Sequence, residues 1–521
     1  MKNSPETRAF ISQLQKFQRE LCACNSKIDC NGLRDFIFSL VVSRFCLARG
    51  VSTEINSSLT PDRSKFNQII DNLHHQDIYF SSNFFELPSF RDLDLSDSQI
   101  EQLRLLVDSS LNGLDISSLG VIYEKFGCQR PNKKEGIYYT PPPIAQMITS
   151  RAIDCRDSNS APSVLDPACG SAIFLIAAYD YICTRYIRGS TNFNEYRRVL
   201  VESIFGIDLD ARAIEVSKVL LLLCYLLKKP IKERNERDLP DLSHNIIVAD
   251  TLTSPPPLLR DRKFDCVIGN PPYGLSRNDQ ITKHDGEILR GKYARFINGK
   301  LNKYLLFMGC GYESLNSSGV LSYIVPNSWL GIENATKLRK MLLESRSLTE
   351  VSVCNFAAFD EPAVEAVIFL VDRSNTRAKL LISHLNSPQT SASYSFKLAH
   401  VTCLKSKSCT IPTFWSSGAT DLFEHLEREC FTLGGTDSPF LPMIALQAYA
   451  RGKGIPPQDS TAATQRVFHT RSSNSECYPY LAGRDVARYS ICWSGEYLRY
   501  GEWLAEPQNL ERFSKPRIVV R

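Results

Sequence analysis

The chain has 521 residues, of which 43% are hydrophobic and 22% are charged, and its formal net charge is +5. This balance is typical of a folded globular protein and excludes a globally disordered chain. The net charge is too small to attract nucleic acid by itself, so such binding requires local basic patches. We expect a cytoplasmic protein without a membrane partner, because no uncharged apolar run could span a bilayer and the N-terminus lacks an apolar export signal.

The 17 cysteines are odd in number and scattered along the chain, which indicates reduced thiols rather than a disulfide framework. Cys22, Cys24 and Cys30 form the one tight cluster. Since no fourth ligand follows at zinc-finger spacing, we expect no metal site.

Residues 1–125 predict a helical domain. The apolar run 33–49 carries charges at helical spacing, and Gly50 ends it. Further helices are expected to begin near Ser96 and Leu119. We interpret this segment as a helical support domain.

Residues 126–400 alternate short β-rich runs with helical stretches, a pattern that predicts an α/β fold with a mainly parallel sheet and helices on both faces. Ligands of such sheets bind beyond the carboxyl ends of the strands. The expected strands are residues 163–165, 204–207, 245–248, 264–268, 320–325 and 367–371.

Residues 401–521 form the third expected segment, and residues 376–440 show no clear pattern. From residue 451, Lys and Arg outnumber Asp and Glu, and aromatic residues are interleaved with them, among them Tyr480, Tyr489, Trp493 and Trp503. This composition suits a nucleic-acid surface. It equally suits a small solvated domain.

A candidate ligand loop lies within residues 164–174 (VLDPACGSAIF), where a strand passes through a small-residue turn into a helix. Gly170 lets the backbone approach a ligand, and Asp166 places a carboxylate at the strand tip, where a ligand ammonium could lie. The loop lacks the Gly-Lys-Ser/Thr ending of a phosphate loop. It therefore favours a cationic ligand without phosphates, a description that fits S-adenosylmethionine.

Two further acids end the next two expected strands. Asp208 could accept both hydroxyls of a ribose, and Asp250 could accept a hydrogen bond from an adenine amino group. Each acid alone could instead be a helix N-cap or a turn residue. Three in succession at strand ends favour a nucleoside site.

The most informative motif is residues 264–273 (FDCVIGNPPY), in which an apolar strand leads directly into Asn270, Pro271, Pro272 and Tyr273. The prolines stiffen the loop and remove two backbone donors. The Asn270 side-chain oxygen and the Pro271 carbonyl are left as acceptors for an amine with two hydrogens, and Tyr273 offers a face for a flipped-out base. A rigid surface turn is the alternative.

With Gly136–Pro142 (GIYYTPP) upstream, the order of these motifs resembles the gamma class of DNA adenine-N6 methyltransferases, found in Taq-type and type IIG restriction-modification enzymes. The resemblance implies a Rossmann-like fold with a seven-stranded sheet, S-adenosylmethionine as cofactor and double-stranded DNA as partner. It also implies that Tyr139, Thr140 and Ala168 contribute to cofactor binding.

Further segments extend the resemblance. Residues 299–307 (GKLNKYLLF) nominate Phe307 as a contact of the cofactor adenine, and residues 356–368 nominate Phe359 for stacking on the target base, with core packing as its alternative. Residues 478–489 resemble the start of a target-recognition region.

Several points depart from the family. Ala172 replaces the second glycine of the cofactor loop, and we expect tolerance because alanine is small and helix-compatible. The end at Arg521 predicts either a truncated recognition region or a separate specificity or nuclease subunit. A protein-glutamine or RNA methyltransferase and a non-catalytic DNA-binding subunit remain alternatives.

Overall fold

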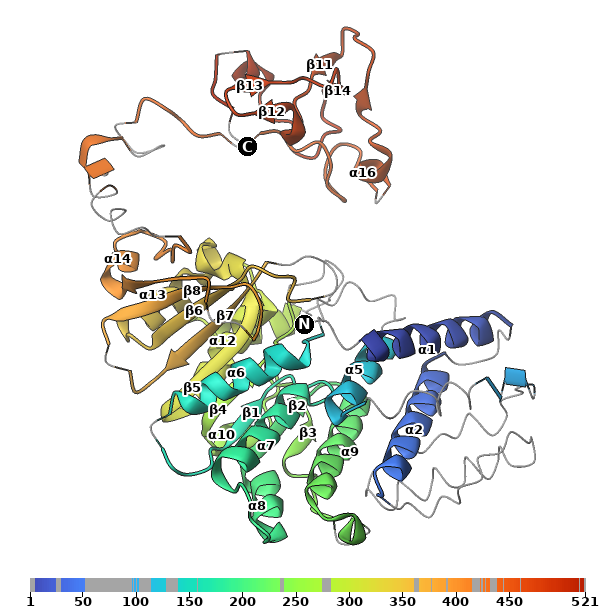
Figure 1. The fold of residues 1–521 in the computed structure, drawn as a ribbon. Coiled ribbons are helices and arrows are strands. Elements are labelled where there is room, and N and C mark those ends of the chain that lie inside the picture. Colours follow the sequence, from blue (N-terminus) through green and yellow to red (C-terminus); the bar gives the residue numbers. More distant parts are fainter. Residues whose placement is uncertain are drawn as a thin grey trace. The chain divides into compact units, whose positions relative to one another are not determined.

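The computed structural model describes residues 5–24, 30–51, 114–127, 139–156, 158–234, 239–273, 283–359, 365–375, 377–389, 392–414, 438–443, 445–459, 461–514 and 516–519, with single positions within 96–102 and 422–431. The chain divides into two compact units, residues 1–415 and 416–521. Each unit is described by itself (Figure 1). None of the described helices is long and apolar enough to cross a membrane.

The first unit is built on a nine-stranded sheet in the order β3-β2-β1-β4-β5-β7-β6-β8-β9 (Figure 1). Neighbouring strands from β3 to β5 run parallel, and β7 is antiparallel to both β5 and β6. The strands are β1 (Val164–Asp166), β2 (Ile204–Asp208), β3 (Ile246–Val248), β4 (Phe264–Gly269), β5 (Leu315–Pro326), β6 (Leu348–Cys354), β7 (Ala366–Asp372), β8 (Lys379–Leu385) and β9 (Tyr394–Ala399).

All six predicted strands are confirmed, and the mainly parallel Rossmann-like architecture with them. The sheet is longer than the seven strands expected, because β8 and β9 extend it beyond β6. The central strands could be predicted from the sequence because they are buried on both faces and therefore form continuous apolar runs. β6 mixes buried with half-buried positions and β9 is largely exposed, so their sequences show no such run.

Helices connect and cover the strands. α6 and α7 pack together against the central strands, α9 packs on β2 and β3, and α12 packs on β4 and β5. The helices of this unit are α1 (Pro5–Cys24), α2 (Cys30–Ala48), α5 (Ile116–Gly127), α6 (Pro142–Asp154), α7 (Ile173–Tyr186), α8 (Phe193–Ser203), α9 (Ala211–Lys228), α10 (Pro257–Asp261), α11 (Lys283–Lys292), α12 (Lys303–Ser314), α13 (Thr336–Glu344) and α14 (His400–Leu404), with short 3₁₀ turns η3 (Ile231–Glu233), η4 (Asn327–Leu330) and η5 (Glu333–Ala335).

The predicted N-terminal helices are present. Of the run 33–49, all but Arg49 lies within α2, which ends at Ala48, and Gly50 adopts the left-handed region at φ 67°. α5 begins at Ile116, where Asp115 accepts a hydrogen bond from the Ser118 backbone N–H at 2.7 Å. Near Ser96, residues 98–99 and 101–102 are helical. The apolar residues of α1, α2 and α5 belong to the same core cluster as the sheet, so this segment shares the core of the first unit.

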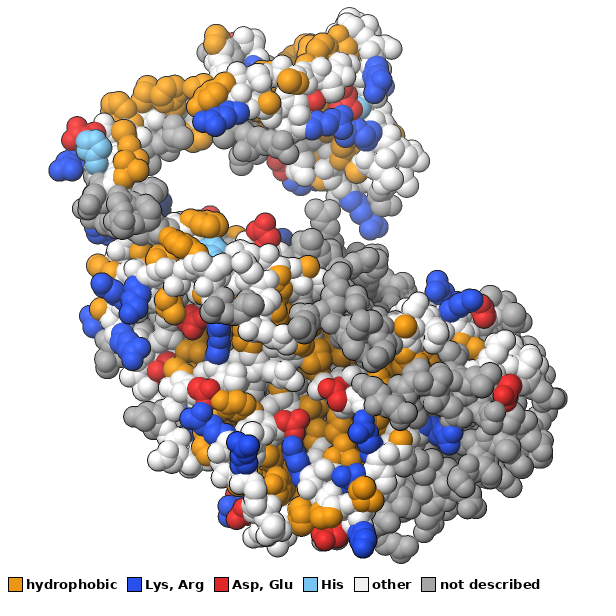
Figure 2. Space-filling model, in the orientation of Figure 1, with side chains coloured by type: hydrophobic (Ala, Val, Ile, Leu, Met, Phe, Trp, Pro, Cys, Tyr) orange, Lys and Arg blue, Asp and Glu red, His pale blue; other side chains and the backbone are white. Residues whose placement is uncertain are grey.

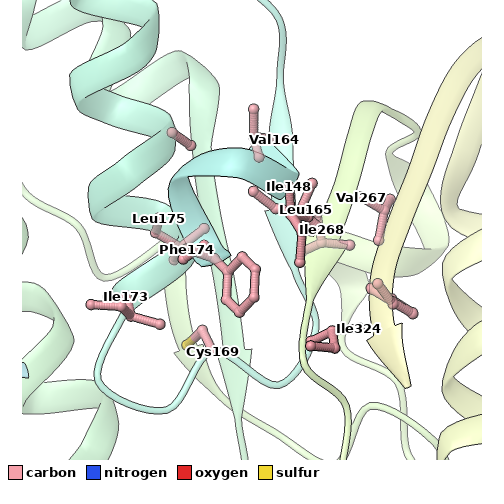
Figure 3. Packing of buried hydrophobic residues seen from close by; sticks show 14 of the residues in the cluster. Ile148, Val164, Leu165, Cys169, Ile173, Phe174, Leu175, Val267, Ile268 and Ile324 are labelled. Carbon is pink, nitrogen blue, oxygen red and sulfur yellow. The ribbon is translucent and has the colours of Figure 1, made fainter. Parts of the chain in front are cut away.

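The core lies directly beneath the loop that follows β1. Leu165 pairs with Phe205 of β2 and with Val267 of β4. Figure 3 shows Phe174 at the start of α7 together with these central strands and Cys169 of the loop. The strand ends that carry the candidate site therefore rest on a fully buried apolar layer.

Residues 401–415 belong to the first unit. α14 packs against α13, and the buried side chain of Arg339 donates hydrogen bonds to the carbonyl oxygens of Ser408 and Cys409 at 2.6 and 3.1 Å. These contacts hold the segment to the sheet.

The second unit contains small strands around a core of Ala448, Leu498 and Leu504. Its elements are α16 (Ala462–Gln465), β10 (His469–Thr470), β11 (Cys477–Pro479), η6 (Gly483–Asp485), β12 (Val486–Ala487), β13 (Ser490–Ile491), β14 (Tyr497–Arg499) and η7 (Leu510–Phe513). β10, β14 and β11 form a three-stranded sheet, and β12 and β13 form a hairpin.

Surface charge on the first unit is mixed. On the face shown in Figure 2, Lys and Arg side chains are interspersed with Asp and Glu and do not gather into one stripe.

In the second unit, Tyr489 is 96% exposed, and the Arg488 guanidinium lies 5.4 Å from the centre of its ring.

Candidate active site

Three adjacent strand ends form the candidate site. β2, β1 and β4 are neighbours in the sheet and run parallel, so Asp208, Asp166 and Asn270 leave it at the same edge. Gly269 brings the last two together, since a Cβ on this glycine would lie 2.7 Å from Asp166 Oδ1. The backbone that carries Asn270 therefore lies directly against the Asp166 carboxylate.

The loop after β1 is shaped by the two acids. Asp166 Oδ1 accepts a hydrogen bond from the Ala168 backbone N–H at 3.1 Å, and Asp208 Oδ2 accepts one from the Gly170 N–H at 2.9 Å. Gly170 adopts a positive φ of 50°, a conformation that costs glycine little. Asp208 is thus both a strand-end carboxylate and a partner of the loop backbone.

Helices and a neighbouring strand end hold the same loop from outside. The Ser217 hydroxyl of α9 donates to the Gly170 carbonyl at 2.7 Å, and the Thr251 hydroxyl after β3 donates to the Pro167 carbonyl at 2.7 Å. Glu124 of α5 accepts hydrogen bonds from the Ser171 N–H and hydroxyl. These residues were not predicted from the sequence, because nothing in a local pattern links positions so far apart in the chain.

Ala172 does not occupy the helical position expected for it. It is the N-cap of α7 and adopts a left-handed conformation with φ 65°. Tolerance of this residue therefore cannot rest on helix compatibility, because a side chain in this region costs about 1–2 kcal/mol. The position favours glycine.

The acids are held where their charged forms are disfavoured. Burial raises the pKa of Asp166 from 3.8 to about 8. The hydrogen bond from Ala168 lowers this pKa, and repulsion from Asp208 and Glu124 raises it further. Burial also raises the pKa of Asp208. A cation placed between them would stabilise both carboxylates and would gain more attraction than in water.

Asp250 has a different environment. Its oxygens accept hydrogen bonds from the Leu252 N–H at 2.9 Å, the Thr253 N–H at 3.0 Å and the Thr253 hydroxyl at 2.5 Å. Burial raises its pKa, but these hydrogen bonds outweigh burial, so the pKa lies below its usual value. Asp250 thus stabilises its own turn, as in the alternative weighed for it from the sequence.

Asn270 is fixed by the segment before α6. Its side-chain Nδ2 donates to the Thr140 hydroxyl oxygen at 3.0 Å. Thr140 is buried, and Tyr139 next to it packs against the core. Pro271 is buried and Pro272 half-buried, so the loop that contains Asn270 is confined on both sides.

Aromatic side chains gather beside this loop. Tyr273 lies edge-to-face with Phe359 at a centroid distance of 5.9 Å and with Tyr304 of α12 at 6.3 Å. The Tyr273 hydroxyl donates to the Ile324 carbonyl of β5 at 3.1 Å. Phe307 is buried in the core on α12. Tyr273 and Phe359 are both buried members of the core cluster, so Phe359 lies beside the loop that contains Asn270 and also packs in the core, which is the alternative weighed for it.

Among the described side chains, no three His, Cys, Asp or Glu residues are grouped to hold a metal ion. The side chains of Cys22 and Cys24 lie outside the described residues, as do Gly136 and Tyr138.

Comparison with protein families assigns the central segment. Residues 202–359 match the family model described as Eco57I restriction-modification methylase. This segment includes Asp208, Asp250, Asn270, Phe307 and Phe359, whereas the loop after β1 lies before it.

Curated relatives agree with this match. The type II restriction enzyme and methyltransferase RM.Eco57I of Escherichia coli is 25% identical over 406 residues, covering 66% of this chain and 40% of that protein. The type II methyltransferase M.VspI of Vibrio sp. (strain 343) is 27% identical over 237 residues, covering 45% of this chain and 48% of that protein. The chain spans less than half the length of either relative.

Among solved structures, the type IIL restriction-modification enzyme MmeI in complex with DNA has a TM-score of 0.55 at 13% identity, over 94% of this chain and 71% of that chain. The type IIG restriction endonuclease BpuSI has a TM-score of 0.50 at 16% identity, over 87% of this chain and 54% of that chain. At these identities the likeness establishes a shared fold.

Proposed function

We propose that this chain, which is related to the restriction-modification methylases, transfers the methyl group of S-adenosylmethionine to N6 of a flipped-out adenine in DNA. The observation that carries the proposal is the place of Asn270, at the end of β4, against Asp166 and with its amide nitrogen hydrogen-bonded to Thr140. The hydrogen bond to Thr140 holds the Asn270 side chain in place, and we propose that its carbonyl oxygen accepts from the target amine.

The cofactor site that we propose surrounds the loop after β1. Asp166, Ala168 and Gly170 line the methionine part, Asp208 accepts the ribose hydroxyls, and Tyr139, Thr140, Asp250 and Phe307 complete it. The buried carboxylates of Asp166 and Asp208 support the fit of a cationic, phosphate-free ligand. Once bound, the sulfonium supplies a methyl group that is already activated by its leaving group.

The protein's own part in the reaction is to hold the target amine. The Asn270 oxygen and the Pro271 carbonyl accept the two amine hydrogens, which localises the nitrogen lone pair. The nitrogen–carbon bond then forms as the carbon–sulfur bond breaks, and the extra proton passes to water. Preorganised acceptors and in-line alignment supply the acceleration, so no strong base is needed.

The aromatic residues beside the loop receive the base. Tyr273 and Phe359 offer faces that offset the unstacking cost of base flipping. Their present edge-to-face contact at 5.9 Å supports a shared role. A base that stacks on Tyr273 would take the place of that contact.

The second unit is proposed to begin the target-recognition region and to contact double-stranded DNA. Exposed Tyr489 and Trp493 with adjacent arginines support this assignment. A specificity or nuclease subunit, or further chain as in the longer relatives, would complete sequence recognition. We place the protein in the cytoplasm, with the host DNA.

The test is a substrate panel with methyl-labelled S-adenosylmethionine. DNA, structured RNA and a release-factor protein are offered to the wild-type chain and to Asn270→Ala, and methylated adenines are mapped in a host that expresses each. We expect label in N6-methyladenine of DNA with the wild type alone, and normal cofactor binding by both. Label in RNA or in a glutamine side chain, or transfer that survives in Asn270→Ala, would refute the proposal.

A further inference from the structure

Helix α5 precedes the sheet and lies outside the segment that matches the methylase family, yet it touches the cofactor loop at two points. Glu124 and Gly120 are one helical turn apart and therefore lie on the same face of α5. A Cβ on Gly120 would lie 3.1 Å from the Ser171 hydroxyl oxygen and 3.5 Å from the Ser171 carbonyl oxygen. The helix thus approaches Ser171 as closely as a glycine permits.

Glu124 binds the loop after β1 through one carboxylate oxygen. Its Oε1 accepts hydrogen bonds from the Ser171 hydroxyl at 2.6 Å and from the Ser171 backbone N–H at 3.2 Å. The contact with the Ser171 hydroxyl has the length of a strong hydrogen bond. Burial raises the pKa of Glu124, and the two hydrogen bonds from Ser171 oppose that rise. The same oxygen would lie 3.0 Å from a Cβ on Gly170, so it covers that residue as well.

The backbone of Gly170 and Ser171 is consequently held from opposite sides. Asp208 accepts from the Gly170 N–H, Ser217 donates to the Gly170 carbonyl, and Glu124 holds Ser171. These residues come from β2, α9 and α5, and only α5 lies outside the methylase sheet and its connections. A shift of α5 would therefore move the loop at the place where the cofactor is proposed to bind.

We propose that Glu124 is a positioning residue of the cofactor site, and that the N-terminal helical segment is thereby a working part of that site. The inference rests on the proposed function, since it concerns the same cofactor loop. Glu124 acts through Ser171 and Gly170. It orients the loop amides and keeps the ribose acceptor Asp208 in register with them.

The test compares Glu124→Ala with Glu124→Gln in the full chain, by calorimetric titration with S-adenosylmethionine and by thermal unfolding. Alanine removes the acceptor, and we expect the Kd to rise about tenfold, the equivalent of one to two hydrogen bonds. Glutamine retains an oxygen at the same place, so we expect it to restore most of the affinity. Ser171→Ala removes one of the two hydrogen bonds, and its Kd should lie between those of the wild type and of Glu124→Ala.

Asp35→Asn is the matched control. Asp35 of α2 pairs with Arg212 of α9 at 2.9 Å, so it also ties the helical segment to the methylase, but its ion pair is with the first turn of α9 rather than with the loop. We expect this variant to lower the unfolding temperature and to leave the Kd unchanged.

A Glu124→Ala protein that binds the cofactor with wild-type affinity would overturn the inference, as would a Glu124→Gln protein with no rescue. If the wild-type chain itself bound no cofactor, the proposed function would fail first, so the two failures are distinguishable.

Discussion

Asn270 and Thr140 are 130 positions apart in the chain, yet the Asn270 amide nitrogen donates a 3.0 Å hydrogen bond to the Thr140 hydroxyl oxygen. Three prolines follow Thr140, and the second of them, Pro142, begins α6, so the backbone after Thr140 is stiff. A threonine hydroxyl can accept from the amide nitrogen, as here, or donate to the oxygen of a turned-over amide, so this contact fixes the place of the Asn270 side chain rather than its orientation. We therefore expect Thr140 to position Asn270, in addition to the cofactor contact that the family resemblance implies.

Thr140→Val replaces the hydroxyl with a methyl group of nearly the same shape. We expect kcat to fall about tenfold, because the loss of one hydrogen bond leaves the Asn270 side chain less firmly held, while the cofactor Kd changes little. Steady-state kinetics on a methylatable DNA, together with cofactor titration, would separate the two effects. Thr140→Ser keeps the hydroxyl and should retain kcat. A valine variant that loses only cofactor affinity would assign Thr140 to the cofactor alone.

Asp208 is expected to act chiefly on cofactor binding. Asp208→Ala removes the proposed ribose acceptor and the partner of the Gly170 N–H, so the Kd for S-adenosylmethionine should rise at least about tenfold. Asp210 offers a control two residues away. It caps α9 by accepting hydrogen bonds from Arg212 and Ala213, so Asp210→Ala should cost about 1 kcal/mol of stability and leave the Kd unaltered. Normal affinity in Asp208→Ala would contradict the ribose assignment.

The sequence predicted the strands and the acids at their ends for one physical reason. β1, β2 and β4 are buried on both faces, so each is a short apolar run, and a polar residue directly after such a run must lie at the edge of the sheet. Asp166, Asp208 and Asn270 follow from that rule. Whether an acid at such a place binds a ligand, its own turn or both does not follow from this rule. Asp250, for which a cofactor contact is proposed, also accepts hydrogen bonds from its own turn.

The contacts between distant segments could not be predicted in this way. Glu124 and Ser171 are 47 positions apart, and nothing in the sequence near either residue indicates the other. β9 was missed because it lies at the edge of the sheet and is largely exposed, so its apolar pattern is weak. β8 is paired on both sides and mostly buried, but Ser383 and His384 interrupt its apolar run. These residues meet because whole helices and strands pack together. The packing of distant elements cannot be inferred from the residue pattern of one short segment.

Ala172 is expected to be a destabilising residue in this chain. Its φ of 65° is disfavoured for any residue with a Cβ, so Ala172→Gly should raise the free energy of unfolding by about 1 kcal/mol, even after the entropy that glycine loses on folding. Chemical denaturation without cofactor would measure the change. Ala168→Gly in the same loop is the control, because Ala168 is outside the left-handed region and should gain nothing. A destabilised Ala172→Gly protein would show that the buried methyl group outweighs the strain.

The Asp166 carboxyl should couple cofactor binding to protons. Burial raises its pKa to about 8 in the folded protein, above the ordinary 3.8 that it regains on unfolding. Between these values the folded state binds a proton that the unfolded state has released, so the free energy of unfolding should fall as the pH rises through this window. A cationic ligand favours the charged carboxylate, so binding below pH 8 should release a proton and the affinity should increase up to that pH. Calorimetric titration in buffers of different ionisation enthalpy measures the released protons directly. Asp166→Asn has no proton to lose and should bind weakly at every pH; a wild-type affinity that stays constant from pH 6 to pH 8 would place the cationic group of the ligand away from Asp166.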